Sequence, residues 1–218
     1  MASQPQALTA IVAIDRMGAI GCKNALPWRL KSDMRFFRET TTGHTVLMGR
    51  KTYESVGGCL PKRNNVVLSH NAVLFASSDK CKLALSIPEA LFVAQKFGSS
   101  ETFVIGGALT YHQFGPFIDR YLVTLIDHEV EHADAFLDQN VLNDIETWER
   151  SKILECDASA DGDDHRFVVY EVSAPDKDAR RLVRSDLIEQ YKSSLPKALK
   201  RQNGKPSRPS RLQEAFAF

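Results

Sequence analysis

Continuous apolar runs divide the first 173 residues of the chain into regularly spaced segments. Residues 8–14, for example, contain only one polar side chain, Thr9. Runs of this kind are typical of strands that are buried on both faces of a parallel sheet. We therefore expect strands at residues 8–14, 45–48, 65–69, 102–105, 120–126 and 166–172, the last with alternating apolar and polar side chains.

Amphipathic segments that predict helices separate these strands. Leu30, Met34 and Phe37 recur at helical spacing, so a helix should begin at Leu30 or Lys31 and end near Glu39. Ser32 or Asp33 could cap it. Further helices are expected at residues 52–56, 88–97 and 110–114, while residues 15–24, with two glycines, are expected to form a loop. Strands that alternate with helices indicate an α/β domain with a mainly parallel sheet.

Three of the predicted strands end in groups that can hold a phosphate. Residues 104–108 run into two glycines, which let a backbone approach a ligand closely. Residues 49–52 add an arginine and a lysine, and residues 68–71 add a serine and a histidine. Each group alone is explained as well by a tight turn or a solvated polar pair. Together they favour a phosphorylated ligand, because ligands of open α/β sheets bind beyond the carboxyl ends of the strands.

Asp33 is a carboxylate among the apolar residues of the first predicted helix. Burial of a carboxylate is costly unless it is paired, so such a position can mark a functional group. The alternative is an exposed acid in the first turn, which interacts favourably with the helix dipole. Considered in isolation, the alternative is favoured, and the neighbouring sequence decides between them.

That neighbouring sequence resembles the dihydrofolate reductase family. A glycine-containing loop leads to Leu26-Pro27-Trp28, and Asp33 and Phe37 follow on the next helix. The resemblance continues through residues 48–55, 60–65 and 104–107, and it ends with Tyr111, Thr124 and the strand at 166–172. It covers roughly residues 8–173 in family order and spacing. It implies a single domain whose sheet has about eight strands with an antiparallel C-terminal edge, flanked by helices.

The resemblance also implies an activity. The family reduces 7,8-dihydrofolate to 5,6,7,8-tetrahydrofolate with NADPH, by hydride transfer to C6 and protonation of N5, and so supports one-carbon and thymidylate metabolism. Antifolate inhibitors would occupy the substrate slot. The resemblance implies NADPH as cofactor, no metal, a monomer and a cytoplasmic location.

Site residues are carried over position by position from the same resemblance. Asp33 would promote protonation of N5 through a bound water, Thr124 would hydrogen-bond Asp33, and Trp28 would help to hold the water. The substrate would contact Ile11, Val12, Leu26, Asp33, Met34, Phe37, Val56, Leu60, Arg63, Ile105, Tyr111 and Thr124, with Arg63 on the glutamate α-carboxylate. The cofactor would contact Ala13, Ile20, Gly21, Gly49, Arg50, Lys51, Thr52, Leu68, Ser69, His70, Ile105, Gly106, Gly107, Ala108 and Leu109.

Two positions depart from the family pattern. Ala108 stands where many relatives have another glycine, and residues 133–136 match poorly, so Asp134 receives no role. Two other readings stay open: a related NADPH-dependent pterin or pyrimidine reductase, and a folate-binding module without activity. Arg63 argues against the related pterin or pyrimidine reductase, because an arginine at this position suits a substrate with a glutamyl tail. The combination of Asp33, Thr124 and Trp28 argues against the second, because binding alone needs no proton path.

The chain has a net charge of +1, but its two parts have opposite charges. Residues 1–175 carry a formal charge of −5 and residues 176–218 a charge of +6. We expect a catalytic domain at 1–175 and a basic extension at 176–218. In the extension, Val183, Leu187, Tyr191 and Leu195 predict an amphipathic helix, and residues 202–218 have a composition typical of disorder. Binding of nucleic acid by this basic tail is the less favoured alternative to a packed helix.

The remaining composition limits the class of protein. The four cysteines form no CxxC pair, which predicts four reduced thiols in a cytosolic protein. No stretch approaches the roughly 20 apolar residues of a membrane helix. The first residues lack the basic start of a signal peptide, so we expect neither membrane nor secretory targeting.

Overall fold

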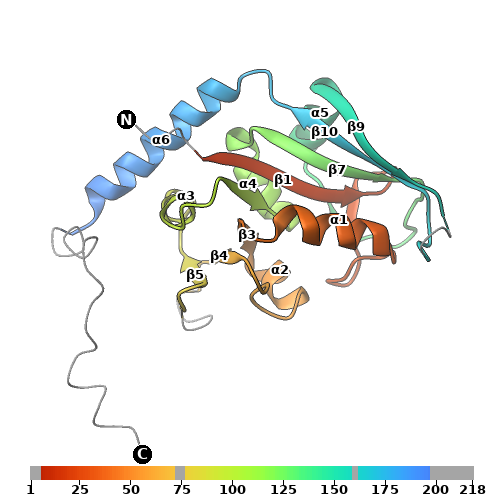
Figure 1. Ribbon diagram of the computed structural model, residues 1–218, viewed down its shortest axis with the longest axis horizontal. Coiled ribbons are helices and arrows are strands. Elements are labelled where there is room, and N and C mark those ends of the chain that lie inside the picture. Colours follow the sequence, from red (N-terminus) through yellow and green to blue (C-terminus); the bar gives the residue numbers. More distant parts are fainter. Residues whose placement is uncertain (1–5, 72–76, 159–161, 197–218) are drawn as a thin grey trace, which may run out of the picture.

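The sheet has eight strands, and the antiparallel C-terminal edge expected for it is confirmed (Figure 1). The computed structural model describes residues 6–71, 77–158 and 162–196. The strand order is β5-β4-β3-β6-β1-β7-β10-β9. All neighbours are parallel except β10, which runs antiparallel to β7 and to β9. The strands are β1 (Ala7–Ile14), β3 (Thr45–Gly49), β4 (Asn64–Leu68), β5 (Cys81–Ala84), β6 (Glu101–Val104), β7 (Arg120–Ile126), β9 (Glu149–Cys156) and β10 (Phe167–Ser173).

Helices cover both faces of this sheet. One face packs against α1 (Lys31–Thr41) and α2 (Arg50–Ser55), through apolar side chains that include Phe36, Phe37 and Tyr53. The other face packs against α3 (Ile87–Lys96), α4 (Ala108–Phe114), α5 (Gln139–Thr147) and α6 (Lys177–Ser194), and a short 3-10 turn, η1 (Gly115–Phe117), follows α4. Both faces of the central strands are therefore buried, which explains their continuous apolar runs. Among the described residues, no helix combines the length and the apolar character needed to cross a membrane.

Several elements were not expected from the sequence. The segment predicted as a loop at 15–24 contains β2 (Ala19–Gly21), which pairs with β8 (Ala135–Phe136). The strands β5 and β9 and the helix α5 were also not predicted. The residues of β9 are mostly exposed because it is the edge strand, so they carry little apolar signal. β5 has only four residues, too few to establish a period.

The cap of α1 differs from the expectation. Neither Ser32 nor Asp33 caps the helix; the cap position is Leu30, whose side chain makes no capping bond. Instead, the Ser32 backbone N–H donates to Oδ1 of Asp163 over 3.0 Å. Ser32 and Asp33 both lie within the first turn of α1, after its first residue Lys31. The acceptor for a free N–H group of that turn is instead the carboxylate of Asp163, which is distant in sequence.

The helix predicted in the extension is present as α6 and packs against α3 and η1. Figure 1 shows it crossing the amino-terminal end of β1. Its buried residues are Arg184 and Ile188, whereas Val183, expected on the apolar stripe, is half-exposed. Arg184 donates to both carboxylate oxygens of Asp119, at 3.1 and 2.8 Å, and its partner is equally buried. The predicted disorder at 202–218 lies outside the described residues.

The expectation of four reduced thiols is wrong for two of them. Cys59 and Cys81 form a disulfide, while Cys22 and Cys156 are free. Parallel pairing of β5 with β4 places the first residue of β5 beside the connection that leads from α2 into β4. The Cα atoms are thereby 6.3 Å apart, within the usual range for a disulfide, although the residues are 22 positions apart in sequence.

Candidate active site

Asp33 and Thr124 meet at the junction of α1 and the sheet. Asp33 lies in the first turn of α1 and Thr124 in the middle of β7, 91 positions later. The Thr124 hydroxyl donates to Oδ1 of Asp33 over 2.6 Å, and both side chains are buried, with 2% and 8% exposure respectively. The structure therefore brings together the two residues expected to handle a proton, and it places the Asp33 carboxylate inside the protein rather than on an exposed helix face.

The surroundings of Asp33 favour its protonated form. Burial is the main cause that raises the pKa of its carboxyl group above the usual value, and the negative charge of Asp163 raises it further. The hydrogen bond from Thr124 acts in the opposite direction. A carboxyl group whose pKa is raised in this way can exchange a proton closer to neutral pH than a solvated aspartate can.

Trp28 is buried against β7 and β10, in a cluster with Leu30, Ile126 and Phe167. Its indole Nε1–H has no acceptor among the described protein atoms. A buried donor without a protein partner is costly unless water or a ligand accepts from it. This observation fits the expected part of Trp28 in holding a water near the proton path.

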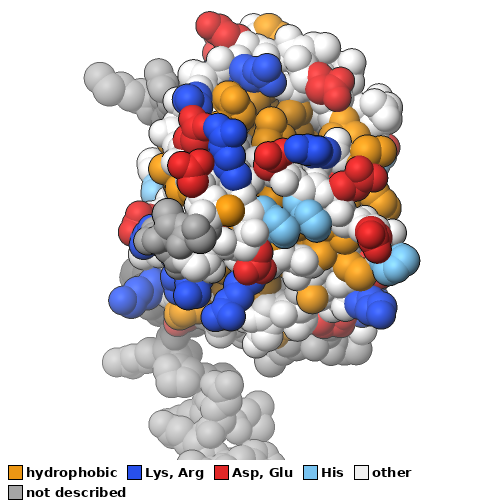
Figure 2. Space-filling view, turned by 90° about the vertical axis from the view of Figure 1, so that its right-hand side faces the viewer, with side chains coloured by type: hydrophobic (Ala, Val, Ile, Leu, Met, Phe, Trp, Pro, Cys, Tyr) orange, Lys and Arg blue, Asp and Glu red, His pale blue; other side chains and the backbone are white. Residues whose placement is uncertain are grey.

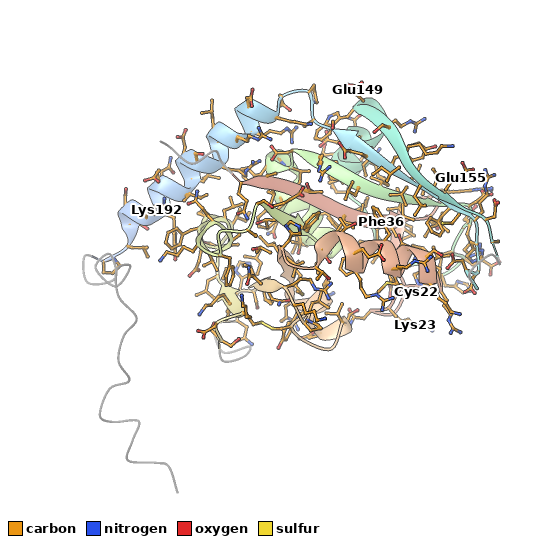
Figure 3. All side chains as sticks on the ribbon, in the orientation of Figure 1. Cys22, Lys23, Phe36, Glu149, Glu155 and Lys192 are labelled. Carbon is orange, nitrogen blue, oxygen red and sulfur yellow. A yellow bond between two sulfur atoms is a disulfide. The ribbon has the colours of Figure 1, made fainter. Side chains whose placement is uncertain are left out.

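Apolar side chains around α1 and α2 are unusually accessible. Leu26, Met34 and Val56 are between 40% and 50% exposed, although they belong to residue types that are usually buried. Phe37 and Leu60 are half-buried beside them, and Ile11 and Val12 are buried in β1. Figure 3 shows the labelled Phe36 between α1 and the sheet, and Cys22 and Lys23 beyond α1 in the loop that contains β2. Accessible apolar groups next to a buried carboxylate are typical of a ligand slot.

Arg63 stands at the far end of these apolar residues, and its guanidinium is buried. Nη1 donates to Oγ1 of Thr41 over 2.9 Å and Nε donates to the Pro61 carbonyl over 3.0 Å. The group lies 5.9 Å from the centre of the Phe37 ring. Burial, and then the neighbouring charge of Arg38, lower its pKa from the usual value. No described carboxylate pairs with Arg63, so its position suits an anionic ligand.

Glycines at the ends of β3 and β6 bring two backbone segments close together. The Gly49 N–H donates to the Gly106 carbonyl over 2.8 Å, and the Gly106–Gly107 peptide bond is cis. Gly106 has a φ of +115°, and a Cβ on it would lie 3.3 Å from the Tyr111 ring and 3.5 Å from Oγ1 of Thr52. Backbone that only glycine can provide, in a place that a Cβ would fill, fits the expected cradle for a pyrophosphate.

The other residues expected to contact a cofactor differ in exposure. Arg50 forms an exposed ion pair with Glu54 at 2.8 Å, and Lys51 and His70 are exposed. Ser69 is buried and accepts from the Asn71 N–H over 3.1 Å, and the Tyr111 hydroxyl donates to the Ile11 carbonyl over 2.7 Å. Ala13, Ile20, Leu68, Ile105 and Ala108 are half-buried, Gly21 is buried and Leu109 is exposed. An exposed ion pair is worth little, so Arg50 can exchange Glu54 for a phosphate at small cost.

Some residues that shape the site were not identified from the sequence. Asp15 accepts from the N–H groups of Met17, Ala19 and Val130, each within 2.9 Å, and so fixes the loop that contains β2. Thr41 holds Arg63, and Asp163 holds the start of α1. An acid directly after a buried strand was a signal for Asp15, whereas nothing local points to the partners of Thr41 or Asp163.

Comparison with known proteins agrees with this geometry. A family model described as dihydrofolate reductase matches residues 7–172, which is most of the chain. The chain belongs to the dihydrofolate reductase family. The match covers every strand of the sheet almost completely and ends before α6.

Individual family members resemble the chain over most of their own length. A dihydrofolate reductase of Bacillus subtilis is 39% identical over 136 residues, covering 61% of this chain and 79% of the relative. The dihydrofolate reductase HdrB of Haloferax volcanii is 34% identical over 174 residues, covering 77% and 84%. A solved dihydrofolate reductase of Enterococcus faecalis, complexed with NADP(H) and RAB-propyl, superposes with a TM-score of 0.65 at 28% identity. That superposition covers 79% of this chain and 98% of the other.

Proposed function

We propose that this chain reduces 7,8-dihydrofolate to 5,6,7,8-tetrahydrofolate with NADPH. The observation that carries the proposal is the buried Asp33–Thr124 pair at the inner end of an apolar slot. A buried cation, Arg63, stands at the outer end of that slot, where the substrate's glutamate would lie. A binding module would gain nothing from a carboxyl group whose burial raises its pKa.

Some residues of the slot orient the substrate, and others take part in proton transfer to N5 of the pterin. Asp33 binds the amino-pyrimidine edge of the pterin and promotes protonation of N5. Thr124 fixes the carboxylate through its hydroxyl, and the Trp28 indole N–H holds the water through which the proton passes. The carbonyls of Ile11 and Ile105 accept from the pterin ring. Arg63 pairs with the α-carboxylate through two parallel hydrogen bonds, which lysine could not reproduce.

The glycine backbone at the end of β6 suits the pyrophosphate of NADPH, with Gly106, Gly107, Ala108 and Leu109 around it. Arg50, Lys51, Thr52, Ser69 and His70 would face its adenosine end. When bound, NADPH supplies the hydride for C6 of the pterin. The loop at 17–24, held through Asp15, would cover the nicotinamide and exclude bulk solvent, apart from the water that Trp28 holds.

The direct test is to follow loss of NADPH absorbance on addition of dihydrofolate, with and without an antifolate. We expect turnover that requires dihydrofolate and that the antifolate abolishes. Oxidation of NADPH with a bicyclic pterin lacking the glutamyl tail, but not with dihydrofolate, would favour a related pterin reductase instead. Tight binding of dihydrofolate without any turnover would indicate a binding module.

Arg63→Ala is expected to raise the KM for dihydrofolate by about tenfold or more, because a charge-assisted hydrogen bond to a carboxylate contributes about 1.5–3 kcal/mol. The KM for NADPH should change little, since Arg63 lies at the opposite end of the slot from the glycines. Steady-state kinetics with each substrate varied in turn measure both values. Arg63→Lys keeps the charge and should recover only part of the loss. A raised KM for NADPH with an unchanged KM for dihydrofolate would contradict this assignment.

Gly106→Ala is expected to weaken NADPH binding by about tenfold, or about 1.4 kcal/mol, because its Cβ would lie 3.3 Å from the Tyr111 ring, in the space through which the pyrophosphate would approach the backbone. Titration of protein fluorescence with NADPH measures the dissociation constant. Gly43→Ala is a matched control: Gly43 also has a positive φ, but it lies at the opposite end of β3 and a Cβ on it meets no atom within 4 Å. Equal weakening in both variants would show general strain rather than a cofactor contact.

A further inference from the structure

Two consecutive acids in the connection between β9 and β10 hold the start of α1. The Asp163 carboxylate accepts from the Ser32 N–H over 3.0 Å. Asp164 makes two bonds with Arg29: its Oδ2 accepts from the Arg29 N–H and its own N–H donates to the Arg29 carbonyl, both over 3.1 Å. These bonds join residues that are more than 130 positions apart.

The part of this connection that carries the two acids makes a further contact, through His165. The rings of His128 and His165 stack with their centres 3.9 Å apart, which ties the connection to the segment that follows β7. Figure 2 shows histidine side chains gathered near the middle of the face that is on the right-hand side of Figure 1. Asp163 is therefore held by its own segment as well as by α1.

Asp163 is the more unusual of the two acids, because it is only 4% exposed. Its Oδ1 accepts the bond from Ser32, while its Oδ2 is buried with no partner among the described residues. A buried carboxylate with an unsatisfied oxygen is unfavourable for stability. Its position beyond the amino end of α1 offsets part of that cost, because the helix dipole is positive there. Asp33 is the next residue along the helix after the one that Asp163 caps.

We propose that Asp163 is a positioning residue for Asp33: it fixes the helical turn that carries the catalytic carboxyl group, and it places a second buried carboxylate at the amino end of that turn. The proposal rests on the proposed function, in which Asp33 promotes protonation of the substrate. A neutral capping group would fix the helical turn but would exert no electrostatic effect on Asp33. A solvated acid would be screened by water, whereas a buried carboxylate interacts with Asp33 through a medium of low dielectric constant.

Asp33 has few other ionisable neighbours among the described residues. Tyr111 from α4 is buried and its own pKa is raised, first by burial and then by the charge of Asp33. From β7 only the Thr124 hydroxyl faces Asp33. Lys31 and Arg35 belong to the same helix, with the Lys31 side chain lying over Gly162 and Arg35 contacting Ser32. Asp163 thus supplies the negative charge that acts on Asp33.

The histidine beside the two acids titrates as well. The pKa of His165 is lowered, first by burial and then by the charge of His128. His165 therefore changes its charge at a lower pH than an ordinary histidine. A His165→Gln variant removes the titration of His165 from the pH profile of turnover.

The test is the pH profile of turnover in Asp163→Asn and Asp163→Ser, compared with the wild type. Both replacements are neutral, and both keep an oxygen that can accept from the Ser32 N–H. Because loss of the charge lowers the pKa of Asp33, we expect the midpoint of the alkaline limb to move to lower pH, with the greatest loss of turnover above the wild-type midpoint. Asp164→Asn is the matched control and should leave the midpoint in place, since Asp164 bonds to the chain before α1.

Circular dichroism and NADPH affinity establish that each variant is folded. A lowered melting temperature with an unchanged midpoint in both Asp163 variants overturns the proposal, because a purely structural cap gives that result. An equal shift in Asp164→Asn also overturns it. In an Asp33→Asn background, Asp163→Asn should have no further effect on the residual pH profile.

Failure of the proposed function would look different. If the wild-type chain did not oxidise NADPH with dihydrofolate, or if Asp33→Asn kept full turnover, the role of Asp33 itself would be wrong. If those two experiments succeed and the Asp163 variants keep the wild-type midpoint, only the inference about Asp163 is wrong.

Discussion

Asp33→Asn is expected to lower turnover at pH 7 by at least ~2 orders of magnitude, the usual scale of a general-acid contribution. Asparagine has nearly the same shape, and its oxygen can still accept from Thr124, so the loss would reflect proton transfer rather than packing. Single-turnover measurements separate the chemical step from product release. Thr124→Val should reduce turnover less, because it removes the orienting hydroxyl and keeps the carboxyl group. Near wild-type turnover of Asp33→Asn at pH 7 would contradict the assignment.

The same substitution is expected to stabilise the protein at neutral and alkaline pH. Burial raises the pKa of Asp33 in the folded state, so the folded chain disfavours the ionised carboxylate relative to the unfolded chain. The free energy of unfolding is therefore not reduced by Asp33 below the pKa that its carboxyl group has in the unfolded chain, and it falls as the pH rises toward the pKa in the folded chain. Asparagine carries no such penalty. The melting temperature of Asp33→Asn should therefore exceed that of the wild type at pH 8, and the difference should shrink in acid.

The second large effect is expected at the ion pair that joins the extension to the domain. Arg184→Met should lower the free energy of unfolding by about 3–5 kcal/mol, because it leaves the buried Asp119 carboxylate with only the longer contact to Arg181, at 3.5 Å, as its ion pair. The pair is almost fully buried, and Arg184 also donates to the carbonyls of Phe117 and Gln6. Denaturant unfolding measures the change. Lys192→Met, which removes an exposed pair with Glu189 from the same helix, should change stability by less than about 1 kcal/mol.

Truncation after Ala174 tests the extension as a whole. It removes α6 and leaves Asp119 bonded to the backbone of Leu8 without a cation. The truncated chain should be at least as unstable as Arg184→Met, although it keeps the part that matches the family model. Unchanged stability would show that α6 is an independent appendage. Salt-sensitive binding of RNA that truncation abolishes would support a role of the basic segment in binding nucleic acid.

The sequence predicted the central strands well because they are buried on both faces. In β1 and β7 almost every side chain is apolar, and the predicted bounds of β7 match the structure. The helix α1 was predicted from the spacing of Leu30, Met34 and Phe37. Its start was also correct, although the capping group lies in another part of the chain.

The elements that were missed have a different cause. β9 lies at the edge of the sheet and exposes most of its side chains, so its apolar pattern is weak. In α5, Val141 and Ile145 are four residues apart and both buried, and this helical spacing is a signal from which the helix could have been predicted. The disulfide between Cys59 and Cys81 depends on the pairing of β4 with β5, which no local pattern predicts.

The site illustrates the same limit. Asp33 and Thr124 were paired through the resemblance, not through any periodicity, since they are 91 residues apart. Asp163 belongs to a polar, acidic stretch that is typical of a solvated loop. Its burial and its bond to Ser32 result from the way the β9–β10 connection folds back over α1.

The long reach of these contacts has a consequence for biosynthesis. The ribosome releases α1 early, but Asp163 emerges 131 residues after Ser32, and Arg184 emerges 178 residues after Gln6. A nascent chain therefore cannot make the bond that caps the first turn of α1 until residue 163 has been translated, nor the bond from Arg184 to Gln6 until residue 184 has been translated. Chains released early by stalled or prematurely terminated ribosomes would lack these long-range bonds, and their exposed strands would make them substrates for chaperones and proteases.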